Sequence, residues 1–213
     1  MFMQTDPFRH REIRRGHPFA EISSQTDGVF IGTTKGRLLV ASPVMGDDNF
    51  DRTVVFMLEH NDEGALGVII NRPSDESDIE GLESWTELAS PPAVVFHGGP
   101  VEQDALIGIA RTESAREGVG WAPITDSLGT VDLSDSPVEI APVLDAIRIF
   151  RGYSGWSPGQ LEGEIELNVW IVAEASSTDV FDHHPDDLWR TVLRRQEGSL
   201  RWLANAPDDL SAN

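Results

Sequence analysis

The predicted fold is centred on the stretch from Arg52 to Pro73, RTVVFMLEHNDEGALGVIINRP. Two runs rich in β-branched and large apolar residues, 53–58 and 65–70, flank a polar turn that ends in Gly64. Two apolar runs around such a turn predict a β-hairpin, because glycine adopts the positive φ that tight turns need. Neither run alternates cleanly between apolar and polar residues, so we expect both faces of the hairpin to be covered.

Short strands and helices alternate in the rest of the chain. The patterns predict strands at 37–41, 93–96, 105–110 (pairing with 93–96), 122–125, 131–133, 146–151 and 169–173. Helices are predicted to begin at Ser77, Ser136 and Ser157 and to span 185–197. Ser77 and Glu80 have the spacing of a capping box, and apolar residues at 79, 82, 85 and 88 form one helical stripe.

We predict one domain, since neither a repeat nor a long linker divides the chain. It is expected to span 28–204, with a flexible N-terminal extension at 1–27 and a C-terminal tail at 205–213. Within residues 1–19, four arginines (Arg9, Arg11, Arg14 and Arg15) outnumber the two acids Asp6 and Glu12 and form a basic arm.

Composition limits the kinds of function. The 213 residues include 36 acids and 16 bases, a net charge of −20, and this field repels phosphate backbones. Cysteine is absent, which excludes disulfides and thiolate chemistry and is typical of a reducing compartment. We find neither a secretory signal nor the run of ~20 apolar residues that spans a membrane, and we expect a cytoplasmic protein.

Motifs of catalysis match poorly. Gly152-Tyr153-Ser154-Gly155-Trp156 resembles a nucleophile elbow, but Trp156 stands at the final glycine position. His183 and His184 lie among acidic residues, and we interpret them as solvated residues at a helix start rather than as metal ligands. We assign no catalytic residue, cofactor or metal.

A binding site is predicted where three segments follow strand ends. These segments are 71–72, 97–99 and 153–160, and they offer a guanidinium, backbone donors beside glycines and a helix start. We expect them to converge on a pocket for a small anionic or polar ligand. The candidate residues are Asn71, Arg72, His97, Gly98, Gly99, Tyr153, Trp156 and Gln160. The alternative is three unrelated turns whose glycines and aromatics serve packing.

Four ordered motifs carry a family resemblance: LLVASPVMGDDNFDRTVVFMLEH, GALGVIINRP, HGGPV and GYSGWSPGQLEGEI. With Trp170 and Phe181-Asp182, the sequence from Leu38 to Trp189 resembles the AlgH/YqgE family of bacterial proteins. The resemblance implies an α+β fold in which a mixed, mostly antiparallel sheet curls into a pseudo-barrel flanked by helices. The family brings no established catalytic residues, and one branch of it carries the label of a transcriptional regulator.

Three functions follow from these patterns. We favour a non-catalytic regulatory module that binds a small ligand or a protein partner. The second is a hydrolase that uses His60 or His97 with a carboxylate such as Glu162 or Glu164, which requires a histidine within hydrogen-bond reach of that carboxylate. The third is nucleic-acid binding through the arginine arm, which the net charge disfavours.

Overall fold

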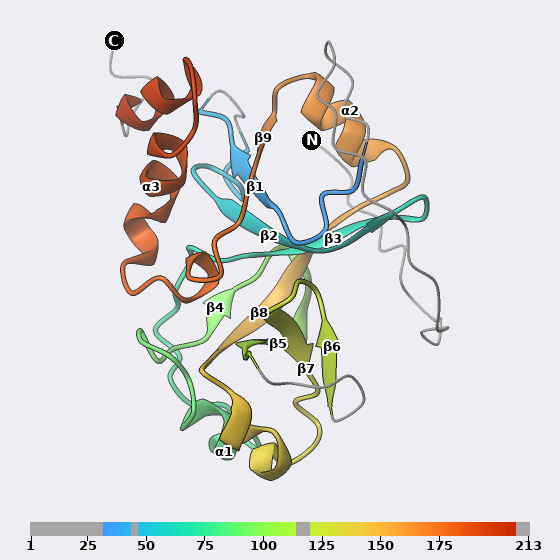
Figure 1. The fold of residues 1–213 in the computed structure, drawn as a ribbon, viewed down its shortest axis with the longest axis vertical. Helices are drawn as coiled ribbons and strands as arrows, with labels where there is room; N and C mark the ends of the chain where they lie inside the picture. The colour runs from blue at the N-terminus through green and yellow to red at the C-terminus, as the bar shows by residue number, and fades with distance from the viewer. Residues whose placement is uncertain (1–31, 44–46, 114–119, 208–213) are drawn as a thin grey trace.

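The computed structural model describes residues 32–43, 47–113 and 120–207. In this part of the chain nine strands form one sheet, with the order β6-β7-β5-β8-β3-β2-β1-β9 and β4 beside β8. The pairing of β4 with β8 is parallel and the others are antiparallel. The sheet curls into a half-barrel with helices packed against it (Figure 1), which confirms the predicted α+β class.

The strands are short except for β5 and β8. Their bounds are β1 Leu38–Ala41, β2 Val54–Asn61, β3 Gly64–Ile69, β4 Phe96–His97, β5 Val101–Arg111, β6 Trp121–Pro123, β7 Leu128–Val131, β8 Ala146–Trp156 and β9 Trp170–Ala173.

The α-helices are α1 Glu83–Thr86, α2 Gln160–Glu166 and α3 Leu188–Arg194. Short 3₁₀ helices occupy Pro137–Glu139, Ala141–Val143, Asp179–Phe181, Pro185–Asp187 and Leu200–Asn205. None of the helices in the described ranges has the length and apolar character of a membrane-spanning segment.

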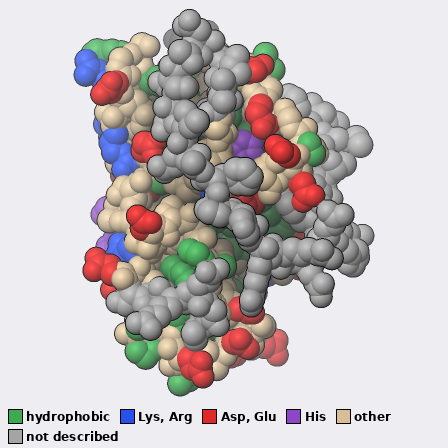
Figure 2. Space-filling view, turned by 45° about the vertical axis from the view of Figure 1, so that its right-hand side comes forward, with side chains coloured by type: hydrophobic (Ala, Val, Ile, Leu, Met, Phe, Trp, Pro, Cys, Tyr) green, Lys and Arg blue, Asp and Glu red, His purple; other side chains and the backbone are tan. Residues whose placement is uncertain are grey.

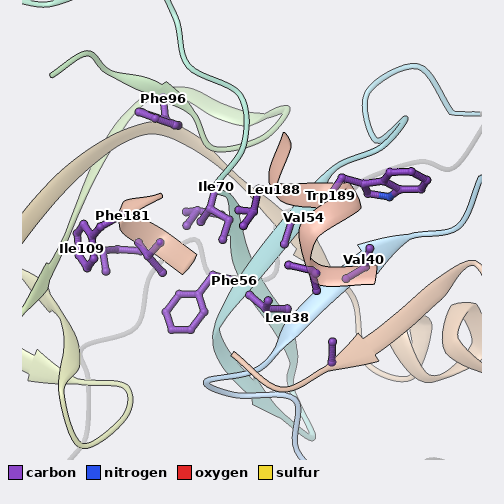
Figure 3. Close-up of a cluster of buried hydrophobic side chains, with 14 of the residues drawn as sticks. Leu38, Val40, Val54, Phe56, Ile70, Phe96, Ile109, Phe181, Leu188 and Trp189 are labelled. Carbon is purple, nitrogen blue, oxygen red and sulfur yellow. The ribbon is translucent and has the colours of Figure 1, made fainter. Parts of the chain in front are cut away.

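The predicted hairpin is confirmed: β2 pairs with β3 in antiparallel register, with a bulge between Met57 and Glu59. Alternate residues of β2 enter two different cores, because successive side chains of a strand point to opposite faces. Val54 and Phe56 join a core that α3 covers (Figure 3), whereas Val55 and Met57 join a second core under α2. All four side chains are fully buried. Because both faces of the strand are covered, its sequence does not alternate between apolar and polar residues.

Strand β8 connects the two halves of the sheet (Figure 1). Its first residues pair with β5 and β4, and its last residues pair with β3. Ile147 and Ile149 pack in a third core with Trp85 of α1, while Phe150 faces the α3 core. The strand is five residues longer than the sequence pattern predicts, because it continues through Gly152 to Trp156.

Two predictions about the segment after the hairpin are wrong. The helix predicted from Ser77 begins only at Glu83: Gly81 adopts φ 85°, and the Ser77 hydroxyl bonds the Asp78 carboxylate instead of capping a helix. The 93–96 run does not pair with β5, because β4 and β5 each pair with β8.

The extension at 1–27, with its arginine arm, lies outside the described residues, and so do the last six residues of the tail.

Candidate functional site

Three basic side chains, Arg72, His97 and Arg151, lie in a row across adjacent backbone segments. The His97 N–H donates to the Arg72 carbonyl (2.8 Å), and His97 pairs with Arg151 in the parallel register of β4 and β8. Residues paired on neighbouring strands lie about 4.8 Å apart along the sheet. We call these three residues the basic row; they come from the segment after β3, from β4 and from β8.

The basic row lines a pocket of about 540 Å³. The other described lining residues come from three places: Asp48 and Asn49 before β2, Ile69 at the end of β3, and Gly99, Pro100, Gln103 and Asp104 around the start of β5. This volume lies within the range of about 300–1,000 Å³ found for small-molecule sites. The pocket is therefore large enough for a metabolite, and most of the residues that line it are polar.

Arg72 is exposed and keeps most of its hydrogen-bonding capacity. Its Nη2 donates to the Asp51 carbonyl (2.6 Å), and among the described residues it has no acidic partner. The neighbouring Asn71 is buried and structural: its amide oxygen accepts from the Val54 N–H (2.8 Å), and its Nδ2 donates to the Arg52 carbonyl (2.9 Å). Asn71 fixes the segment from which Arg72 extends.

Arg151 is held in place by Glu76. Its Nε and Nη2 donate to the two oxygens of the Glu76 carboxylate, at 3.1 and 2.8 Å. Such a two-point contact sets the plane of the guanidinium as well as its position. The backbone of the segment that carries Glu76 is in turn hydrogen-bonded to Val95, just before β4. Sequence reasoning missed Arg151 and Glu76, since their contact depends on the pairing of distant strands.

Gly98 and Gly99 let β4 approach β8 closely. A Cβ at Gly98 would lie 2.2 Å from the Gly152 carbonyl oxygen, and a Cβ at Gly99 would lie 2.3 Å from the Tyr153 carbonyl. The Gly98 N–H donates to the Arg151 carbonyl (2.8 Å) and so is already used within the sheet. Gly99 lines the pocket, whereas Gly98 contributes by bringing His97 beside Arg151.

The remaining predicted residues, Tyr153, Trp156 and Gln160, do not line this pocket. Tyr153 is buried in the α3 core and Trp156 in the α2 core. The Trp156 indole N–H donates to Glu164 (2.9 Å), which also accepts from Trp170 (2.8 Å) and from the Gln160 amide (3.0 Å). We call Glu164 with its three donors the α2 network. It joins α2 to β8 and β9.

His60 meets the geometric condition set for a hydrolase, but in a closed arrangement. Its Nε2 lies 3.0 Å from the Glu162 carboxylate, and its Nδ1 accepts the backbone N–H of Thr34 (3.0 Å). The Thr34 hydroxyl also lies 3.0 Å from Nδ1, and Thr34 is fully buried. Both ring nitrogens are engaged with protein groups, so neither is turned toward a substrate. The contact fastens residues 33–35 and α2 to β2.

Arg148 is the other arginine of β8, and it is structural. It stands three residues before Arg151, so the two side chains point to opposite faces of the strand. Its guanidinium donates to the carbonyls of Val180, Pro91 and Asp182 and lies over the Phe96 ring. Burial lowers the pKa of Arg148 to about 10, and the Asp182 carboxylate opposes part of this shift.

His183 and His184 are exposed and lie before α3. The His184 N–H donates to the Asp182 carboxylate (2.7 Å). Within the described ranges no three His, Asp or Glu side chains are grouped as a metal site would require.

Comparison with known proteins identifies relatives over most of the chain. The AlgH-like family model matches residues 38–201. A UPF0301 protein of Streptomyces coelicolor is 47% identical over 189 residues, which cover 86% of this chain and 97% of the relative. A UPF0301 protein of Thermobifida fusca is 45% identical over 187 residues, covering 84% of this chain and 94% of the relative.

Two solved structures share the fold. A crystal structure of a Corynebacterium diphtheriae protein is 30% identical, with a TM-score of 0.77, and covers 83% of this chain and 94% of that one. The solution structure of the AlgH protein from Pseudomonas aeruginosa is 28% identical, with a TM-score of 0.61, and covers 88% and 100%. The predicted resemblance is confirmed, and this chain belongs to the AlgH-like (UPF0301) family.

Proposed function

We propose that this protein is a non-catalytic module that binds a small polar ligand in the pocket of the basic row. The observation that carries the proposal is the state of Arg72. It lines the pocket together with His97, and in the described chain it has no acidic partner, although acids outnumber bases by 36 to 16. An exposed guanidinium in a concavity is well suited to bind a carboxylate or phosphate oxygen.

The state of the two histidines supports binding rather than catalysis. His97 lines the pocket, but in the part of the chain that the structure describes no carboxylate accepts from its ring. His60 has such a carboxylate, Glu162, but its other nitrogen faces buried Thr34. A general base needs both an orienting partner and a nitrogen open to the substrate, and each histidine supplies only one of these.

The acidic surface supports a small ligand over a nucleic acid. Figure 2 shows acidic side chains scattered over one face, with lysine and arginine mainly along its left edge. A net charge of −20 opposes the close approach of a polyanion. We expect no sub-micromolar DNA binding at about 0.15 M salt. Such binding in a competition assay, lost on deletion of residues 1–27, would instead favour the arginine arm as a nucleic-acid contact.

Calorimetric titration of the full chain tests the proposal. The probes are L-amino acids, short hydroxy acids and inorganic phosphate, and Arg72→Gln is the test variant. Arg194→Gln is the matched control, since Arg194 is an exposed arginine on α3 outside the pocket. We expect at least one probe to bind the unchanged chain and Arg194→Gln equally, and Arg72→Gln about tenfold more weakly or worse. Equal binding by both variants, or no binding of any probe, would refute the proposal.

A further inference from the structure

The described wall of the pocket carries charges of both signs. Arg72 and Arg151 contribute two positive charges, and Asp48 and Asp104 contribute two negative charges. Among the described residues, Glu76 adds a third carboxylate that contacts Arg151. These described groups have no excess of positive charge, in spite of the basic row.

A wall with both signs of charge and no excess of positive charge disfavours a strongly anionic ligand. Phosphate would gain contacts with Arg72 but would also lie near the carboxylates of Asp48 and Asp104, in a protein with a net charge of −20. Like charges brought together in a concavity cost binding energy, and unpaired polar groups that lose water cost more. A ligand that carries one anionic and one cationic group has a partner of opposite sign for each.

We infer that the ligand is a small zwitterion, with a carboxylate and an ammonium group, and this inference rests on the proposed function. The carboxylate binds the guanidinium of Arg72 and is oriented by Arg151. The ammonium group, which has three donors, binds the carboxylates of Asp48 and Asp104. Inorganic anions and monocarboxylates bind less well, because they leave both aspartates without a cation.

The contact between Glu76 and Arg151 supports this arrangement. It uses Nε and Nη2 of Arg151, so Nη1 remains for the pocket. Glu76 offsets part of the positive charge of Arg151, and it also fixes the orientation of the Arg151 guanidinium. Arg151 thus acts as an oriented donor, and Arg72 supplies the charge that the carboxylate requires. Glu76 is a positioning residue.

Calorimetric titration with matched probes tests the inference. Each zwitterion is compared with the acid and the amine that carry only one of its charges: 4-aminobutyrate with butyrate and butylamine, and 6-aminohexanoate with hexanoate and hexylamine. Glycine and inorganic phosphate complete the set. We expect one zwitterion to bind at least about tenfold tighter than its single-charge partners and than phosphate. Its affinity should also change little between low and high salt, because the ligand has no net charge.

Variants of the wall assign the two ends of the ligand. Arg72→Gln should weaken zwitterion and monocarboxylate alike. Asp104→Asn and Asp48→Asn should reduce the preference for the zwitterion over its acid by several fold, while Asp62→Asn, on the exposed β2–β3 turn, should leave it unchanged. Because Asp48 and Asp104 are exposed, these variants are expected to fold, and circular dichroism checks this.

The outcomes separate this inference from the proposed function. If phosphate or a monocarboxylate binds as tightly as the zwitterion and depends on Arg72, the zwitterion inference is overturned and the binding function stands. The inference is also overturned if the aspartate variants keep the full preference. If no probe binds in a way that depends on Arg72, both fail together.

Discussion

The pocket and the α2 network contain similar side chains in opposite states. In the α2 network the Glu164 carboxylate accepts three donors, and next to it His60 is engaged at both ring nitrogens. In the pocket, Arg72 donates to a single carbonyl and the exposed His97 ring has no hydrogen-bond partner in the described ranges. Polar groups bonded to each other within a fold stabilise it, whereas polar groups left open in a concavity remain available for a ligand.

This contrast separates polar motifs that serve the fold from polar motifs that remain open to a ligand. The GYSGW and GQLE segments contain more aromatic and amide side chains, but Trp156 and Gln160 donate their side-chain N–H groups to Glu164 within the fold. The NRP and HGG segments contain fewer aromatics, and they bring Arg72 and His97 to the pocket. The predictions below test whether the first region serves stability and the second serves binding.

The largest effect should come from the scaffold that both regions share. Val68 lies fully buried on β3, in the core that α3 covers. Val68→Asp places an unpaired carboxylate there, and we expect it to lower the free energy of unfolding by about 3–5 kcal/mol. Urea denaturation followed by circular dichroism measures the change. An unaltered unfolding midpoint would contradict the assignment of the hairpin to the centre of the fold.

Next in size should be the loss of the acceptor in the α2 network. Glu164→Ala leaves the indole N–H groups of Trp156 and Trp170 without their carboxylate partner. Because Glu164 is only partly buried, each of the two donors should lose about 1–2 kcal/mol, and we expect a total cost of about 2–4 kcal/mol. Glu166→Ala is the control, since Glu166 is exposed on the same helix, and its cost should stay within about 0.5 kcal/mol. Equal costs for the two variants would show that the network adds no stability.

The two histidines give a smaller and more direct contrast. His60→Ala removes the acceptor of the Thr34 N–H and the contact with Glu162, and it should cost about 1–3 kcal/mol. His97→Ala removes an exposed side chain and should cost less than about 0.5 kcal/mol. Thermal unfolding of both variants at one pH measures the difference. If His97→Ala costs as much as His60→Ala, His97 has a structural role, and the proposed contrast between the two histidines is wrong.

The sequence predicted elements whose signal is local. The β2–β3 hairpin was predictable because its apolar runs and its turn are adjacent. The helix predicted to begin at Ser157 forms, and Gln160 accepts from the Ser157 N–H, but α2 begins only at Gln160 and its N-cap is Gly159. The helix from Ser77 failed, because Gly81 interrupts the stripe with a positive φ. The predicted pairing of 93–96 with 105–110 was wrong for a different reason. Glycines serve both tight turns and the close approach of two strands, and Gly98 and Gly99 serve a close approach to β8.

Part of the pocket lining was predictable for the same reason. Arg72, His97 and Gly99 stand at strand ends, where loops of a sheet meet, and they line one pocket. Arg151 was missed because it lies inside a strand and reaches the pocket through its register with His97. Asp104 was missed because it lies in the irregular part of β5, between the pairs formed by Val101 and Leu106. Long-range register of this kind is not encoded in any single segment.

Amide chemical shifts measured on ligand binding distinguish the open pocket from the closed α2 network. The ¹⁵N-labelled full chain is titrated with 6-aminohexanoate and, separately, with hexanoate and inorganic phosphate. We predict that the tightest of these probes shifts the amides of Arg72, His97, Gly99 and Arg151 and leaves those of α2 and His60 unchanged. Shifts that concentrate on α2 and His60, with the pocket amides unmoved, would contradict the account, because the closed region would then be the one that binds.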